Sequence, residues 1–226
     1  MKITSFLLFF LIPLVAADLR VSFDNVTCPR AESIVCQFVQ KVFETDSSIT
    51  GALLRMHFHD CFVMGCDASI LTDSTTRKPS EKLAGPNLTV RGYELIDKIK
   101  KSLEAACPST VSCADIVLAT RDSVVLAGGP NYAAPTGRRD GLVLNPNDVN
   151  LSDPSFSVSE ALQAFTAKGI TLNDMVTLLG AHTVGFAHCN FFQDRFSDFQ
   201  GSESLDINHL MNPLTYSFKF KNVLYT

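Results

Sequence analysis

The sequence predicts a mainly α-helical protein. Apolar residues recur at three- and four-residue spacing over six segments, whereas strand signals are weak throughout. At 226 residues the chain suits one domain, or two lobes that share a cleft, and it contains no internal repeats. Its net charge of −4 gives no electrostatic reason to expect nucleic acid as a partner.

The first three helices are expected over residues 31–43, 46–62 and 90–106. In the first of these, Ile34 and Phe38 belong to an apolar stripe with helical spacing. The third is amphipathic, with leucines and isoleucines on one side and lysines on the other. These segments therefore predict surface helices that turn one face toward a core.

The fourth helix, expected over residues 112–126, is apolar nearly all round and ends before Gly128, Gly129 and Pro130. Such a helix is expected at the centre of the molecule. A capping pattern, Thr171 followed by Asp174, begins the last helix. The remaining order is a long loop over residues 135–154 and helices over 157–168 and 171–183.

The amino-terminal residues have the features of a secretory signal. Lys2 precedes an apolar run over residues 6–17, which ends in small residues such as Ala17. The expected organisation is a signal peptide over residues 1–17 and one domain over 18–226. That run is short for a membrane span and no later segment matches its length, so we expect a secreted protein without a membrane anchor.

Secretion gives meaning to the seven cysteines, because disulfides persist outside the reducing cytosol. The number is odd, so at least one thiol is free or pairs outside the chain. Three glycosylation sequons are also present, at Asn25, Asn87 and Asn150, and we favour the first and the last.

Residues 55–67 (RMHFHDCFVMGCD) hold the densest group of chemically active side chains. On a helix Arg55 and His59 share one face, with Phe58 beside them, because residues three and four apart are neighbours. His57 and His59 point in roughly opposite directions, which argues against one metal bound by both. The pattern therefore predicts a pocket formed by a guanidinium, an imidazole and an aromatic ring.

A second group surrounds His182, which ends an apolar stripe that includes Leu178 and Leu179. One interpretation is a core histidine satisfied by a neighbour. The other follows from the small residues Gly180 and Ala181 beside it, which let a flat group approach the backbone. A neutral imidazole that faces an apolar slot is what a haem iron requires of its axial ligand.

Together the two groups resemble the secreted plant haem peroxidases (class III peroxidases). The resemblance is carried by residues 55–70 (RMHFHDCFVMGCDASI) and 179–189 (LGAHTVGFAHC), and it extends from about residue 23 to about residue 205. It implies a two-lobed, mainly α haem peroxidase fold, with haem b between distal and proximal helices. Supporting motifs are TCP at 27–29, SEK at 80–82, RGY at 91–93, VSCAD at 111–115 and GRRD at 137–140.

The resemblance assigns roles to five residues around the haem. His182 is expected to be the axial ligand, His59 the distal acid–base group and Arg55 the stabiliser of developing negative charge. Asn87 is expected to orient the distal imidazole, and Phe58 to lie against the distal haem face. A glycan on Asn87 would be incompatible with that buried role.

The resemblance also implies calcium. Hard oxygen ligands close together in one loop suit Ca²⁺. A second, proximal calcium site would begin at Thr183, and Ser152 stands where the family usually offers a proline carbonyl to the reducing substrate. The expected distal calcium ligands are Asp60, Val63, Gly65, Asp67 and Ser69, with Glu81 acting through water.

The cysteines fit the family only in part. The resemblance pairs Cys28 with Cys107 and Cys61 with Cys66. Cys113 and Cys189 lack their family partners, and Cys36 is not a family cysteine. A buried ion pair of the scaffold is expected between Asp115 and Arg138.

From about residue 206 onward the chain no longer resembles the family, so the last part of the proximal lobe is expected to be missing. The implied function is oxidation of phenolic donors by hydrogen peroxide, in peroxide removal, lignin or cell-wall phenol oxidation and the oxidative stress response. We expect a monomer in the extracellular space, cell wall or vacuole. Two alternatives are a haem-poor, non-catalytic secreted protein and an extracellular calcium-binding module.

Overall fold

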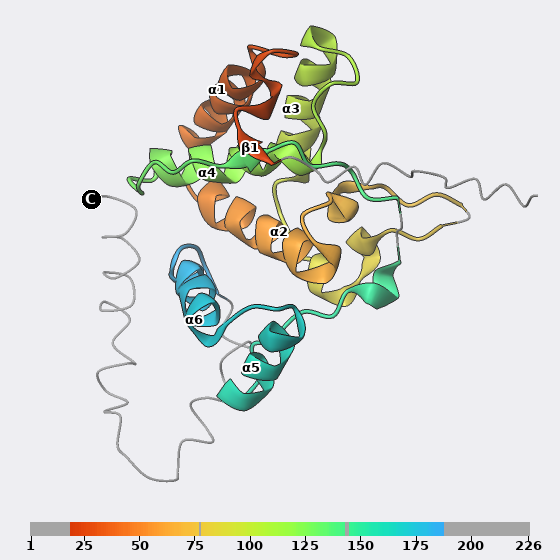
Figure 1. The fold of residues 1–226 in the computed structure, drawn as a ribbon, viewed down its shortest axis with the longest axis vertical. Helices are drawn as coiled ribbons and strands as arrows, with labels where there is room; N and C mark the ends of the chain where they lie inside the picture. Colours follow the sequence, from red (N-terminus) through yellow and green to blue (C-terminus); the bar gives the residue numbers. More distant parts are fainter. Residues whose placement is uncertain (1–18, 77, 143–144, 188–226) are drawn as a thin grey trace, which may run out of the picture.

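The computed structural model describes residues 19–76, 78–142 and 145–187, and it is mainly helical, as predicted (Figure 1). Two short strands, β1 (Arg20–Val21) and β2 (Pro135–Thr136), pair antiparallel with Arg20 opposite Thr136. The α-helices of the described residues are α1 (Ala31–Phe43), α2 (Ile49–Met64), α3 (Tyr93–Ala106), α4 (Val117–Leu126), α5 (Val158–Ala167) and α6 (Leu172–Gly180).

Helix α2 lies between two groups of helices. On one side are α1, α3 and α4, and on the other are α5 and α6 (Figure 1). The larger core packs α1 against α3 and α4 and buries Val39, Leu53 and Ile99. A smaller cluster that includes Phe62 and Phe165 joins the far side of α2 to α5 and α6. One face of α2 thus belongs to the larger core, and the opposite face looks toward α6.

Polar side chains and glycine explain where helix ends differ from the prediction. The fourth helix begins at Val117, after a 3-10 helix over Ala114–Ile116. The Asp140 carboxylate accepts the Ala114 N–H at 2.9 Å, so this turn is tied to a distant loop rather than continued as α-helix. Helix α3 starts only after Gly92, whose φ of 107° lies in the left-handed region.

Both helices of the smaller group begin with a capping box. Ser157 and Glu160 form it at α5, and Thr171 and Asp174 form the predicted one at α6. Helix α6 ends at Gly180 and continues as a 3-10 helix over Ala181–Thr183, so His182 stands just beyond the regular helix.

Two disulfides match the expected pairs. Cys28–Cys107 joins the residues before α1 to the end of α3, and Cys61–Cys66 closes the carboxyl end of α2. Cys36 and Cys113 are free. The expected signal peptide, Cys189 and the segment from about residue 206 lie outside the described residues. None of the helices in the described ranges has the length and apolar character needed to cross a membrane.

Candidate active site

Arg55 and His59 face the same side of α2, as their four-residue spacing predicts. The Nε–H of Arg55 donates to Nε2 of His59 at 3.2 Å. His59 is buried, with 7% of its surface exposed. The imidazole and the guanidinium thus form one hydrogen-bonded unit on the face that turns toward α6.

Asn87 holds the other ring nitrogen of His59. The Nδ1–H of His59 donates to Oδ1 of Asn87 at 2.7 Å, and Nδ2 of Asn87 donates to the Glu81 carbonyl at 2.8 Å. The second bond fixes which end of the amide faces the imidazole, so Nδ1 carries the proton and Nε2 keeps its lone pair. Asn87 is 2% exposed, which leaves no room for a glycan at this sequon.

The surroundings of His59 keep its imidazole neutral. The pKa of His59 is lowered to about 4, chiefly by burial; the hydrogen bond to Asn87 opposes this shift, and the neighbouring Arg55 and His182 add to it. At neutral pH the ring is therefore unprotonated at Nε2, whose lone pair accepts the hydrogen bond from Arg55.

Thr89 and Pro86 hold Arg55 in place, and sequence reasoning did not single them out. Arg55 donates to the Pro86 carbonyl at 2.9 Å, to the Thr89 hydroxyl at 2.9 Å and to the Thr89 carbonyl at 3.2 Å. Backbone carbonyls leave no signal in a sequence. Thr89 does have a signal in the sequence, because it is the third residue of the Asn87 sequon. That signal indicates glycosylation and not a contact with Arg55.

His182 lies across from this unit, in the 3-10 helix after α6. Its Nδ1–H donates to the Leu178 carbonyl at 3.2 Å, which leaves Nε2 free as a ligand atom. The Phe58 ring lies 5.3 Å from the His182 ring and 5.9 Å from the His59 ring, centroid to centroid. The structure therefore brings both imidazoles to one phenylalanine. His182 is solvent-exposed, so the interpretation as a satisfied core histidine does not apply.

The donor set fits a haem iron, because His182 offers an unprotonated Nε2 and the distal side offers a neutral base and a cation. The slot itself is narrow. A porphyrin between two rings needs about 3.5 Å of contact distance on each face, whereas the edge of one ring already meets the face of the other at a centroid distance of 5.3 Å. Phe58 and α6 must move apart to admit the group.

A backbone contact joins α2 to the loop after His182. A Cβ atom on Gly51 would stand 2.8 Å from Cα of Gly185 and 3.1 Å from the Val184 carbonyl oxygen. Gly185 itself has a φ of 120°. The absence of a side chain at Gly51 is thus what allows this close approach.

The predicted distal calcium loop follows α2. Asp60 is 6% exposed; its Oδ2 accepts the Ala68 N–H at 3.1 Å, and its Oδ1 has no hydrogen-bond partner among the described residues. The pKa of Asp60 is raised to about 7, chiefly by burial; the hydrogen bond from the Ala68 N–H opposes this shift, and the charges of Asp67 and Glu81 add to it. A buried carboxylate oxygen without a partner, near two more acids, suits a hard cation.

The other predicted ligands are only partly arranged for an ion. The Ser69 hydroxyl donates to Glu81 at 3.1 Å, and the Ser69 N–H donates to Asp67 at 3.1 Å. The Val63 carbonyl accepts a hydrogen bond from Nζ of Lys168 at 2.6 Å, a contact that sequence reasoning missed. Gly65 has a φ of 98°, which allows the turn between the two cysteines.

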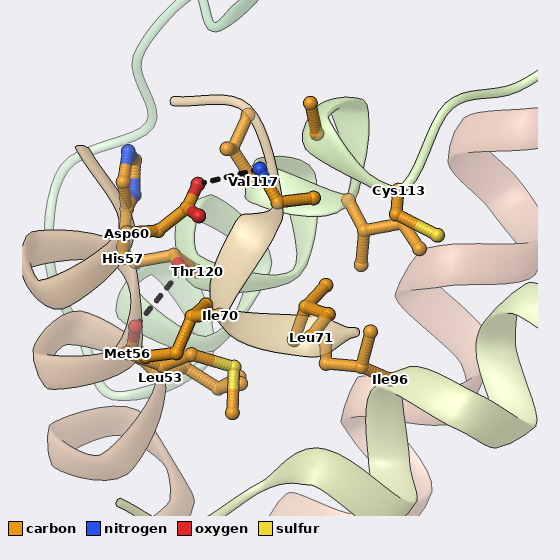
Figure 2. A pocket seen from close by; sticks show the side chains of 13 residues that line it. Leu53, Met56, His57, Asp60, Ile70, Leu71, Ile96, Cys113, Val117 and Thr120 are labelled. Carbon is orange, nitrogen blue, oxygen red and sulfur yellow. Dashed lines mark hydrogen bonds between the residues drawn. The ribbon is translucent and has the colours of Figure 1, made fainter. Parts of the chain in front are cut away.

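A small cavity lies behind this loop, and Figure 2 shows His57 and Asp60 among its lining residues. Its volume is about 30 Å³, enough for one or two water molecules but not for a substrate. The side chain of His57 also lies close enough to those of Cys61 and Cys66 for the three to share one metal ion. Those two sulfur atoms are bonded to each other, so they are not available as thiolates.

Four further predicted residues lie in less informative places. The Thr183 hydroxyl donates to the Gly180 carbonyl at 2.8 Å, and Ser152 is half-buried in the loop before α5. Asp115 accepts the backbone N–H groups of Gly137 and Arg138 at 2.8 and 3.0 Å, while the Arg138 guanidinium stands 3.8 Å away. The ion pair is thus present, and backbone donors supply the shorter contacts.

Fold and site together define the peroxidase class of helical proteins. Residues 35–217 match the family model described as Peroxidase, and the chain therefore belongs to the peroxidase family. Within that family it belongs with the class III plant peroxidases.

Three relatives from Arabidopsis thaliana are similar over most of the chain. Peroxidase 44 is 63% identical over 195 residues, which cover 85% of this chain and 63% of that protein. Peroxidase 57 is 61% identical, with 86% of this chain and 62% of the relative covered. Peroxidase 28 is 58% identical, with coverages of 89% and 65%. The chain thus spans somewhat less than two thirds of the length of these relatives.

Proposed function

We propose that this chain is a secreted haem peroxidase that oxidises phenolic donors with hydrogen peroxide. The observation that carries the proposal is the hydrogen-bonded series Arg55–His59–Asn87, in which a neutral base and a fixed cation face a second imidazole. His182 would hold haem b through its free Nε2. Family membership and the named relatives support the same activity.

Haem iron, when bound, supplies the redox chemistry that accepts two oxidising equivalents from peroxide and passes them to two donors. His59 moves the proton. Its Nε2 would take one proton from hydrogen peroxide and return it to the oxygen that departs as water. Asn87 keeps Nδ1 protonated throughout, so Nε2 alone exchanges protons.

Arg55 stabilises the negative charge that develops on the departing oxygen, because a guanidinium remains cationic at any working pH. In the described arrangement its Nε–H occupies the His59 lone pair. Peroxide must therefore replace that hydrogen bond with one of its own before the proton can move. The contacts from Thr89 and Pro86 keep the guanidinium nearby during the exchange.

Calcium has a structural role in this proposal. Asp60, Asp67 and Glu81 would hold the ion directly or through water, and the ion would fix the carboxyl end of the helix that carries His59. We further propose that Ser152 contacts the phenolic donor and that Thr183 belongs to a second calcium site. Asn25 and Asn150 are exposed and suit glycosylation in a secreted monomer.

The test uses the full chain produced in a secreting host, supplied with haem and calcium. A Soret band and oxidation of a phenolic dye by hydrogen peroxide are the expected results. His59→Leu should lower the turnover by about 10²–10⁴-fold, the usual contribution of a general acid–base group. Asn150→Gln, an exposed sequon variant, serves as the control and should leave the rate unchanged. Equal rates in His59→Leu and the parent would contradict the proposal.

A second candidate is a secreted protein of the same family that retains little haem and has no activity. The observation that favours it is the direct ring contact of Phe58 with His182, which fills the slot. Passage of the reconstituted chain through a desalting column separates the two candidates. Retention of the Soret band supports the enzyme, and loss of the band with an intact far-UV spectrum supports the haem-poor protein.

A further inference from the structure

Lys168 makes an unusual contact across the molecule. It follows the last residue of α5, and its Nζ donates to the Val63 carbonyl near the end of α2, 105 residues earlier, at 2.6 Å. The same ammonium lies 5.9 Å from the centroid of the Phe62 ring. Among the described residues it forms no ion pair with a carboxylate. Its position is therefore set by a carbonyl and a ring.

The carbonyl that Lys168 binds is one of the oxygens expected to coordinate calcium. The other members of that set lie in the loop after α2, where Asp60 keeps one buried carboxylate oxygen without a partner. The Lys168 ammonium thus places a positive charge at the Val63 end of the loop. A protein cation at an oxygen that a metal needs affects how tightly the metal binds.

Two effects of Lys168 on calcium have the same sign. First, the ammonium occupies a lone pair of a ligand oxygen, and that hydrogen bond must lengthen or break when the carbonyl turns to the ion. Second, a positive charge that close to the ligand oxygen repels a divalent cation even where solvent screens it. Both effects weaken calcium binding, and the hydrogen bond also stabilises the loop without calcium.

We propose that Lys168 sets the calcium affinity of the distal loop: it caps the Val63 carbonyl while the loop is free of calcium, and it opposes entry of the ion. The inference rests on the distal calcium site of the proposed function. Because Lys168 adjoins α5, calcium entry also weakens a tie between α5 and α2. The loop and the smaller helical group therefore respond to the same ion.

The experiment measures calcium affinity of the full chain without haem, by competition with a fluorescent chelator at low ionic strength. Lys168→Met keeps the apolar stem and removes the charge and the donor. It should bind calcium roughly five- to tenfold more tightly than the parent, and the difference should shrink with added potassium chloride. Lys168→Arg keeps the charge and should remain near the parent. Lys41→Met changes an exposed lysine of α1 and should have no effect.

A second readout is the unfolding midpoint in excess EDTA. There Lys168→Met should be less stable than the parent, because the Val63 carbonyl has lost its donor. Equal calcium affinity of Lys168→Met and the parent would overturn the inference while leaving the calcium site intact. Failure of every variant and of the parent to bind calcium would instead overturn the site itself.

Discussion

The two imidazoles of the site are held in very different ways. His59 is buried and bonded on both ring nitrogens, by Arg55 from its own helix and by Asn87 from a separate turn. His182 is exposed, and its Nδ1 is hydrogen-bonded to the Leu178 carbonyl four residues earlier in the chain. The distal side is therefore arranged by tertiary contacts before any ligand arrives. The position of the proximal ring depends on a local turn and on the ring of Phe58.

The largest expected effect comes from breaking the contact between the two helical groups. Phe165 is fully buried and packs on Phe58 and Phe62 of α2. Phe165→Ala should cost about 3–5 kcal/mol locally, with hydrogen exchange rising in α5 and α6 while α1 to α4 stay protected. Phe186→Ala is the control, because Phe186 is 81% exposed. An equal rise in all six helices would show one cooperative unit and remove the contrast between the two sides.

Removal of the proximal ligand tests whether the exposed imidazole is the one that holds haem. His182→Ala should weaken haem binding by more than about 100-fold, beyond what loss of a supporting contact causes. Added imidazole should restore part of the Soret band, since a free base can take the vacant position. A parent-like band in His182→Ala without imidazole would assign the axial role to a different residue.

The distal network predicts a smaller but directional effect. Asn87→Ala leaves the Nδ1–H of His59 buried without an acceptor and should cost about 1–3 kcal/mol of unfolding free energy. Asn87→Asp should instead raise the pKa of His59, because a carboxylate stabilises the imidazolium. Proton NMR titration of the imidazole measures the second effect. Asn150→Asp, at an exposed position, is the control, and an equal shift there would contradict a specific role for Asn87.

The smallest effect concerns Asp122 on α4, a buried acid that the proposed chemistry does not use. Its Oδ1 accepts from Arg121, its Oδ2 is buried without a partner among the described residues, and burial raises its pKa. Because the pKa is higher in the folded state, the contribution of Asp122 to stability is greatest at pH values below its unfolded-state pKa and falls as the pH rises. Asp122→Asn cannot ionise, so its unfolding free energy should increase relative to that of the parent as the pH rises from 3.5 to 7.

Urea unfolding at the two pH values measures this gain. Asp97→Asn, at an exposed position of α3, should show no such dependence. A loss of stability in Asp122→Asn that grows with pH would mean that the ion pair with Arg121 outweighs the burial of the charge.

Local patterns predicted the helices and the residues that share a helix face. The pairing of Arg55 with His59 follows from four-residue spacing, and the start of α6 follows from its capping box. Motif resemblance supplied the link from His59 to Asn87, 28 residues apart.

The sequence did not predict contacts that join distant segments through backbone carbonyls, because a carbonyl is present at every residue and leaves no sequence pattern. Thr89 reaches Arg55 partly by a backbone carbonyl, and Lys168 reaches a carbonyl of α2. The Phe58 contact with His182 depends on how closely two helical groups approach, which spacing along a chain does not contain.

Because Gly51 and Gly185 have no side chains, they determine how closely α2 approaches the loop after His182. Two backbone segments approach there with no side chain between them, and a Cβ atom on Gly51 would stand only 2.8 Å from Cα of Gly185. A methyl group added at Gly51 would push the two segments apart, and this displacement would extend to α6. Selection at a single codon could in this way adjust how readily a flat cofactor enters, without altering any residue that touches the chemistry.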